Sequence, residues 1–183
     1  MNPRNFFVGR AIGFIVVLVL VGGYFLFNSY IYQQKQGPVL DYKNTTYTVE
    51  GEVVQLTNGM SEVEAAPGSA SKVTTKYFGN EAKGDLNADG IPDIAFLLTQ
   101  NSGGSGTFYY VVASLQDKDS GYLGTNAVLL GDRIAPQTTE IKDGEIIVNY
   151  ANRAPGDPMT APPSVGVSKY LRVDNGVLVE TVQ

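Results

Sequence analysis

The sequence contains no cysteine and no histidine among its 183 residues. Without cysteine, the chain forms no disulfide bond and has no N-terminal cysteine to carry a lipid. Without either residue, it lacks the nucleophile–histidine pairs of hydrolases and the usual side-chain ligands of zinc and haem. An exported form must therefore rely on its hydrophobic core for stability. The length suits one ordinary domain with an appendage.

Clusters of basic residues are also missing. Three of the 13 lysines and arginines lie in the first 35 residues, whereas all 18 acidic residues come later, so the remainder of the chain is strongly acidic. A surface of this sign repels nucleic-acid phosphates and anionic lipid headgroups, and it suits divalent cations better. We therefore expect no nucleic-acid partner.

The first thirty or so residues differ from all that follow. The run from Ala11 to Phe27 carries no charge. Together with Tyr30 and Ile31, it provides roughly 20 apolar residues, which is enough for one helix to cross a bilayer. The alternative is a cleaved signal peptide, but its apolar core is usually only about 7–15 residues long and ends at a small-residue site. Here the run ends in the bulky sequence YFLFNSYIY.

Two arginines precede this run and no acidic residue does, which indicates a cytoplasmic N-terminus because positive charge stays on that side. The sequence therefore predicts a single-pass protein of the cell membrane. We expect a cytoplasmic N-terminus (1–10), a transmembrane signal anchor (11–31), a linker (32–40) and an extracytoplasmic β domain (41–183).

The remainder shows no long 3.6-residue periodicity of apolar residues. Short runs rich in valine, isoleucine, threonine and aromatic residues alternate with turn residues instead. Asn58-Gly59, Asp143-Gly144 and Asn175-Gly176 each predict a type I′ turn, in which both central residues need positive φ. The most apolar runs, residues 92–100 and 107–116, should pair as the central hairpin. We predict a mainly β domain of about eight to ten strands, either an antiparallel β-sandwich or a curved β-meander.

The stretch GDLNADGIPD carries the most specific chemical signal. Counted from Asp85, positions 1, 3 and 5 supply side-chain oxygens, position 6 is glycine and position 7 offers a carbonyl, as in calcium loops. Position 12 is Phe96 and not the bidentate glutamate of an EF-hand, so the carboxylate at position 9 must serve as a direct ligand. The expected ligands are Asp85, Asn87, Asp89, the carbonyl of Ile91, and Asp93. The alternative is an Asx-type turn that binds nothing.

This DxNxDGxxD variant resembles, over residues 78–98, the calcium loops of FG-GAP blades, dockerins and thrombospondin-type repeats. The preceding Phe78-Gly79 and the apolar run after the loop are most similar to FG-GAP, in which the loop joins two strands. The resemblance implies a structural calcium ion held by the five residues above. It occurs once, so it does not imply a propeller.

Longer phrases resemble an uncharacterised family of membrane-anchored or exported bacterial proteins. They are EAAPGSASK, YFGNEAKGDLNADGIPD, GGSGTFYYV, LLGDRIAPQTTE and NYANRAPGDP, between about Tyr47 and Val179. This resemblance implies export and one intact domain, and it supplies no mechanism.

Two loops with alanine–proline turns each hold one arginine, Arg133 in residues 131–140 and Arg153 in residues 149–158. These arginines could fix their loops by local contacts, or they could recognise a carboxylate or a peptide. The sequence leaves two hypotheses. One is a non-enzymatic, membrane-anchored extracytoplasmic module with a calcium-stapled loop, which binds an envelope protein or a glycan. The other is a cell-envelope enzyme or enzyme inhibitor that uses the two arginine loops.

Overall fold

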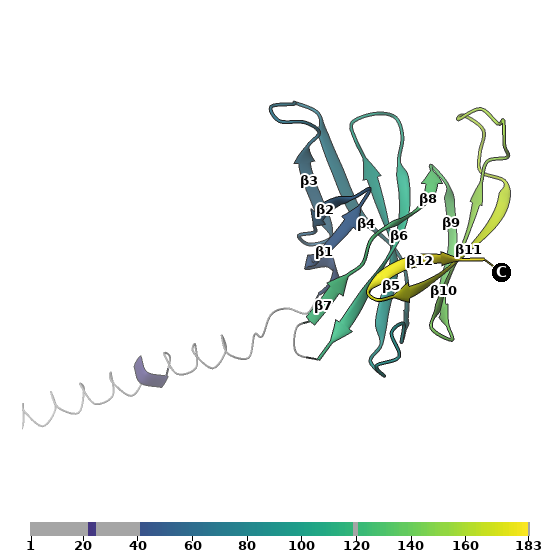
Figure 1. Ribbon diagram of the computed structural model, residues 1–183. Helices are drawn as coiled ribbons and strands as arrows, with labels where there is room; N and C mark the ends of the chain where they lie inside the picture. Colours follow the sequence, from purple (N-terminus) through teal and green to yellow (C-terminus); the bar gives the residue numbers. More distant parts are fainter. Residues whose placement is uncertain (1–21, 25–40, 119–120, 183) are drawn as a thin grey trace, which may run out of the picture. The chain divides into compact units, whose positions relative to one another are not determined.

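The computed structural model describes residues 22–24, 41–118 and 121–182 (Figure 1). The chain divides into two units, Met1–Val39 and Leu40–Gln183. In the first unit the description covers residues 22–24, which are helical and exposed. The expected cytoplasmic N-terminus, membrane anchor and linker otherwise fall outside the described residues. Among the residues that are described, no helix is long and apolar enough to span a membrane.

The second unit is mainly β, as predicted, and its strands form three antiparallel sheets. A short 3-10 helix, η1 (Tyr42–Asn44), precedes the hairpin of β1 (Thr46–Val49) and β2 (Glu52–Gln55). The central sheet comprises β3 (Met60–Glu64), β4 (Lys72–Gly84), β5 (Asp93–Asn101), β6 (Phe108–Asp117), β7 (Gly121–Gly124) and β8 (Val128–Asp132). The third sheet comprises β9 (Ala135–Lys142), β10 (Glu145–Asn152), β11 (Val165–Asp174) and β12 (Val177–Thr181).

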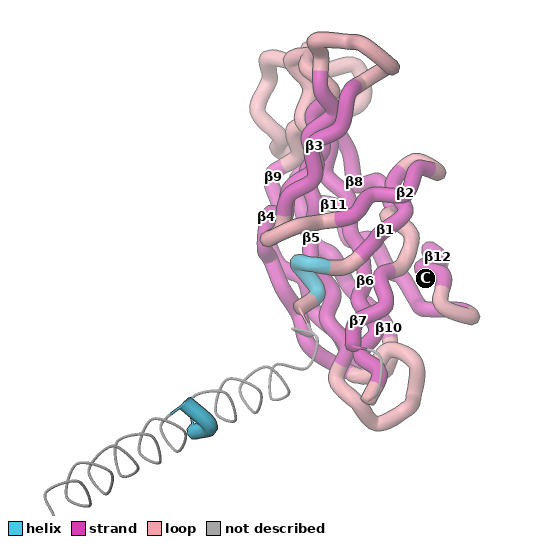
Figure 2. Tube along the Cα trace, turned by 90° about the vertical axis from the view of Figure 1, so that its left-hand side faces the viewer, coloured by secondary structure: helices cyan, strands magenta, loops and turns pink. Residues whose placement is uncertain are grey.

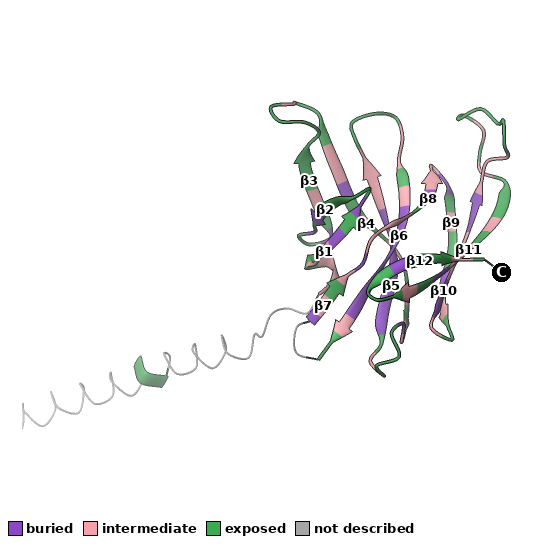
Figure 3. Ribbon diagram, in the orientation of Figure 1, coloured by how far each residue is buried: buried purple, intermediate pink, exposed green. Residues whose placement is uncertain are grey.

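The central sheet is covered on both faces, which explains the continuous apolar runs in β5 and β6. One face packs on the third sheet, through Leu97 and Val111 against Ile146, Val148 and other core residues. The opposite face packs on the β1–β2 hairpin, which Figure 2 shows lying across β5 and β6. Figure 3 shows buried residues concentrated along the middle of β5, β6 and β10. Because each face of β5 meets a different layer, its residues are buried without alternation.

The predicted pairing of the two most apolar runs is confirmed, because β5 and β6 are antiparallel neighbours. All three predicted turns have positive φ at both central residues. Asp143-Gly144 joins β9 to β10, and Asn175-Gly176 joins β11 to β12. The Asn58-Gly59 turn closes only a single bridge, between Thr57 and Met60. The strands on either side of it, β2 and β3, belong to different sheets. This turn therefore moves the chain from one layer to the next.

The structure has twelve strands in its described part, more than expected. One reason is that the apolar run around residues 122–131 is interrupted. β7 and β8 both pair with β6, at its two ends. Between them, Thr125 still donates its amide to the Ala113 carbonyl of β6, and Asn126 leaves the sheet to bridge to Thr48 of β1. Thr48 donates its amide to the Thr125 carbonyl, and Ala127 donates to the Thr48 carbonyl.

An aromatic cluster holds the start of this unit against the core. The Tyr42 ring lies with its centroid 5.4 Å from that of Phe96 and 5.7 Å from that of Tyr122. Tyr47 packs edge-on against Phe96, and its hydroxyl donates to the Tyr42 carbonyl at 2.6 Å. Since Phe96 is fully buried, η1 is fastened directly to the core beneath the hairpin.

The Glu81 carboxylate stands beside this cluster. It accepts hydrogen bonds from the hydroxyls of both Tyr42 and Tyr77, and Lys43 lies 3.8 Å away. The Lys43 ammonium also lies 3.9 Å from the centroid of the Tyr77 ring. Burial would raise the pKa of Glu81, but the two hydroxyls and the nearby lysines outweigh it and lower that pKa.

Candidate metal-binding loop

The stretch GDLNADGIPD connects β4 to β5, as the sequence predicts for a loop between two strands. Gly84 pairs with Asp93 across the base, and residues 85–92 form the loop. Gly90, at position 6, has a φ of 80°, which confirms the expected bend. Ala88 also has positive φ, 62°, a conformation that its side chain disfavours. The loop therefore turns back sharply at two points.

The side-chain oxygens at positions 1, 3 and 5 accept hydrogen bonds from the loop's own backbone. Asp85 Oδ2 accepts from the Gly90 amide at 2.9 Å, and Asn87 Oδ1 accepts from the Asp89 amide at 3.1 Å. Asp89 Oδ1 accepts from the Ile91 amide at 2.7 Å. These bonds curl the loop around its own polar side chains.

Asp85 has one oxygen with no such partner. Its Oδ1 atom is buried and makes no hydrogen bond within the part of the chain that the structure describes. A buried acceptor without a partner carries an unfavourable desolvation cost, on the order of 1–3 kcal/mol and more for a charged group. Carboxylate oxygens are the ligands that calcium prefers. The first predicted ligand therefore offers an oxygen suited to a cation.

Asp93, the ninth position, is fully buried. Its Oδ2 accepts from the Leu86 amide in the loop, and its Oδ1 accepts from the Gln116 amide at the end of β6, both at 2.8 Å. Burial raises the pKa of its carboxyl, the two amides oppose that rise, and the charges of Asp89 and Asp85 add to it. The net direction is a rise, because burial is the largest of these effects and outweighs the two amide hydrogen bonds.

The predicted ligands do not surround a common point. Asn87 Nδ2 donates to Asp89 Oδ2 at 3.0 Å, and both Asp93 oxygens face backbone amides. Within the described residues, no group of three or more aspartate, glutamate, histidine or cysteine side chains is placed to hold a metal ion. The loop has the ligand types and the bend at glycine, but Asn87, Asp89 and Asp93 would have to redirect oxygens inward. The calcium site therefore stays a prediction.

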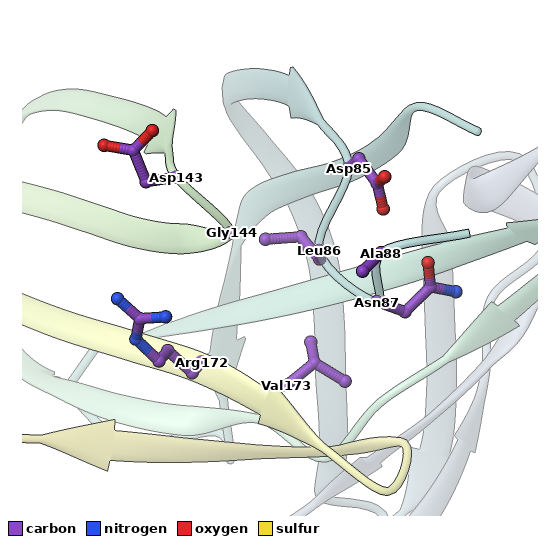
Figure 4. Close-up of a pocket in the computed structure, with 8 residues that line it drawn as sticks. All are labelled: Asp85, Leu86, Asn87, Ala88, Asp143, Gly144, Arg172 and Val173. Carbon is purple, nitrogen blue, oxygen red and sulfur yellow. The ribbon is translucent and has the colours of Figure 1, made fainter. Parts of the chain in front are cut away.

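A pocket of about 440 Å³ opens beside the loop (Figure 4). Asp85 and Asn87 line one side, the Asp143-Gly144 turn lines another, and Arg172 of β11 completes the wall. Arg172 is paired with Glu145 at 3.2 Å. Two of the five predicted ligands, Asp85 and Asn87, thus line this open recess.

The structure brings the two arginine loops together. Arg153 donates from Nε to the Ala161 carbonyl at 2.7 Å, and from Nη1 to the carbonyls of Asp132 and Arg133 at 3.0 and 3.2 Å. Arg133 pairs with its neighbour Asp132 at 3.0 Å. Burial alone would raise the pKa of Asp132. The contact with Arg133, the hydrogen bond from the Thr107 amide and the charge of Arg153 outweigh burial and lower that pKa. The Arg153 guanidinium therefore holds loop backbone, and the Arg133 guanidinium holds the neighbouring Asp132 carboxylate.

Sequence reasoning missed two features of the loop. The Gln116 amide comes from a strand distant in sequence, and no local pattern signals it. Gly84 could have been singled out as a second glycine at the loop base; a β-carbon there would lie 2.5 Å from Ile141 Cγ2 of β9. No family model, curated protein or solved structure matches the chain.

Proposed function

We propose that the chain is a membrane-anchored, extracytoplasmic binding or structural module whose β4–β5 loop is fastened by calcium. The observation that carries the calcium part is the buried Asp85 Oδ1 atom, which has no partner in a loop of otherwise bonded side chains. The anchor and the export are supported by the apolar run of residues 11–31, with its flanking arginines, and by the resemblance to membrane-anchored bacterial proteins.

The loop geometry supports a structural role for the ion better than a catalytic one. The loop joins two neighbouring strands of the central sheet, and Asp93 ties it to β6. An ion at this point would hold β4, β5 and the end of β6 together. With three carboxylates, we expect a modest affinity, on the order of 10⁻⁴–10⁻³ M, as in other extracellular modules.

The first test is thermal unfolding of the full chain in non-ionic detergent, with calcium and with a chelator. At free calcium about 100-fold above Kd, binding stabilises the fold by about 2.7 kcal/mol. For a domain of this size, that corresponds to a rise in Tm of roughly 5–10 °C. Identical melting curves in calcium and in chelator would refute the proposal.

A matched pair of variants locates the effect. Asp89→Asn keeps an acceptor oxygen for the Ile91 amide but removes one charge. A tenfold weaker affinity would remove about 1.4 kcal/mol, or half of the calcium-dependent gain. Asp174→Asn changes an exposed aspartate beside the Asn175-Gly176 turn and should leave the calcium response unchanged. Equal responses in the two variants would place any calcium effect outside this loop.

A further inference from the structure

A second pocket, of about 510 Å³, lies on the other side of the central sheet, between the β1–β2 hairpin and β3. Half of its lining is aliphatic: Val49, Val53, Val54, Val63, Ala65 and Val73. Val53 and Val63 are 74% and 57% exposed, so this lining presents apolar surface to solvent. The molecule therefore presents an open apolar recess here.

The charged residues of this lining are all acidic. They are Glu50, Glu52 and Glu64, and no lysine or arginine lines the pocket. Within the described residues, none of the three forms an ion pair: Glu64 accepts a hydrogen bond from the Gly68 amide, and Glu50 lies against the Tyr110 hydroxyl. Burial, together with the charge of Glu50, raises the pKa of Tyr110 to about 12. The lining is thus acidic, and the nearest cation in the β3–β4 register, Lys72 opposite Glu64, is paired with Glu62.

Glu50 lies in a backbone conformation that is unfavourable for glutamate. It occupies the first central position of the β1–β2 turn with a φ of 52°, where asparagine or glycine is usual. A glutamate in this conformation carries a backbone cost on the order of 1 kcal/mol. The turn therefore holds a carboxylate over the pocket at some expense in stability.

The chemistry selects an organic cation over a metal ion. The glutamates do not group closely enough to hold a metal, since no such cluster occurs in the part of the chain that the structure describes. A lysine or arginine side chain fits better, because its aliphatic stem can lie on the valines while its charged end reaches a carboxylate. The pocket volume accommodates one or two such side chains.

The edge of the sheet indicates how such a side chain is presented. β3 is the terminal strand of the central sheet, so within the described residues no strand pairs with its outer edge. An extended peptide can hydrogen-bond to a free edge and place alternate side chains on one face. On β3, Ser61 and Val63 face the pocket, and a peptide beside them would direct its alternate side chains the same way.

We infer that this recess, defined by Glu50, Glu52, Val53, Val63 and Glu64, docks an extended peptide with lysine or arginine next to apolar residues. This rests on the proposed function as a binding module and specifies its partner chemistry. Anionic glycans and acidic peptides are excluded by charge. The arginine loops take no part.

The test uses the full chain in non-ionic detergent and a fluorescently labelled octapeptide of alternating valine and lysine, followed by fluorescence anisotropy. Two control peptides replace lysine by glutamate or valine by serine, and protein-free micelles give the background. We expect binding of the valine–lysine peptide, weaker binding of the serine–lysine peptide and no binding of the valine–glutamate peptide. Absence of valine–lysine binding, or equal binding of the acidic peptide, overturns the inference.

Variants of the protein place the site. Glu52→Gln removes a carboxylate that makes no ion pair with any described residue and should weaken binding about two- to fivefold at low salt. Val63→Ser removes exposed apolar surface and should weaken it comparably. Glu140→Gln, on β9 of the third sheet, is the matched control and should change nothing. If Glu52→Gln and Val63→Ser bind as tightly as the parent, the docking surface is wrong. The calcium-dependent rise in Tm, measured on the same preparations, separates that outcome from failure of the proposed function.

Discussion

Replacing Gly84 with alanine tests the packing that supports the loop. Gly84 is the last residue of β4 and pairs with Asp93 at the loop base. Its φ lies outside the left-handed region, so alanine meets no backbone obstacle. The obstacle is steric, because the new β-carbon would lie 2.5 Å from Ile141 Cγ2 and 3.0 Å from Ile141 Cβ. One of the two strands must therefore move.

The expected cost follows from that contact. Forcing an extra carbon into a packed position costs about 1–3 kcal/mol. Alanine recovers about 0.5–1 kcal/mol relative to glycine within a strand. We expect Gly84→Ala to lower the free energy of unfolding by about 1–2 kcal/mol, measured by urea unfolding of the full chain. Gly166→Ala on β11 is the control, because a β-carbon there meets nothing within 4 Å.

A double-mutant cycle identifies the clash as the cause. Ile141→Ala removes the methyl group that Gly84→Ala would strike, so the double variant should be more stable than the sum of the single effects by about 1 kcal/mol or more. An additive cycle, or a Gly84→Ala variant as stable as Gly166→Ala, would refute the packing of β4 on β9 at this point.

Two further predictions concern the Glu81 carboxylate beside Tyr42 and the arginines of the two loops. The pKa of Glu81 is lowered, so its contribution to stability is complete above its unfolded-state pKa and is lost as pH falls through the folded-state value. Tyr42→Phe removes one donor and should raise that pKa in an NMR titration of the carboxyl carbon; an unchanged value would contradict the hydrogen bond. Arg153→Ala should lower the free energy of unfolding by about 1–3 kcal/mol in urea, since three carbonyls lose a charged donor. Arg133→Ala should cost less than 1 kcal/mol or so, because its partner is the adjacent, partly exposed Asp132, and equal costs would argue against the clamp.

Local chemistry made part of the fold predictable. Asp143-Gly144 and Asn175-Gly176 need positive φ at both positions, a requirement of the dipeptide itself, and each joins two neighbouring strands. The runs that became β5 and β6 were recognisable because both faces of each are buried. The bend at Gly90 and the side-chain bonds of Asp85 and Asn87 likewise depend on spacing alone.

Contacts between distant residues were not predictable in this way. The break between β7 and β8 exists because Asn126 leaves the sheet, bridges to Thr48 and bonds with the backbone of Leu178. No local periodicity records such partners. Similarly, spacing marked Asp93 as a ligand, whereas its burial and its bond to Gln116 depend on how β6 lies beside β5. The acidic recess was not predictable from the sequence, because it forms only when the β1–β2 hairpin, which carries Glu50 and Glu52, packs beside Glu64 of β3.

The aromatic fastening of η1 has a mechanical consequence. Any tension on the chain ahead of Asp41 enters the domain at Tyr42, whose ring is wedged against Phe96 and Tyr122. From there the load passes to β1, which is held by β2 along one edge and by residues 125–127 along the other. A pull along β1 would have to shear both sets of backbone hydrogen bonds together. Force applied ahead of Asp41 therefore meets ring contacts at Tyr42 first and then backbone hydrogen bonds on both edges of β1.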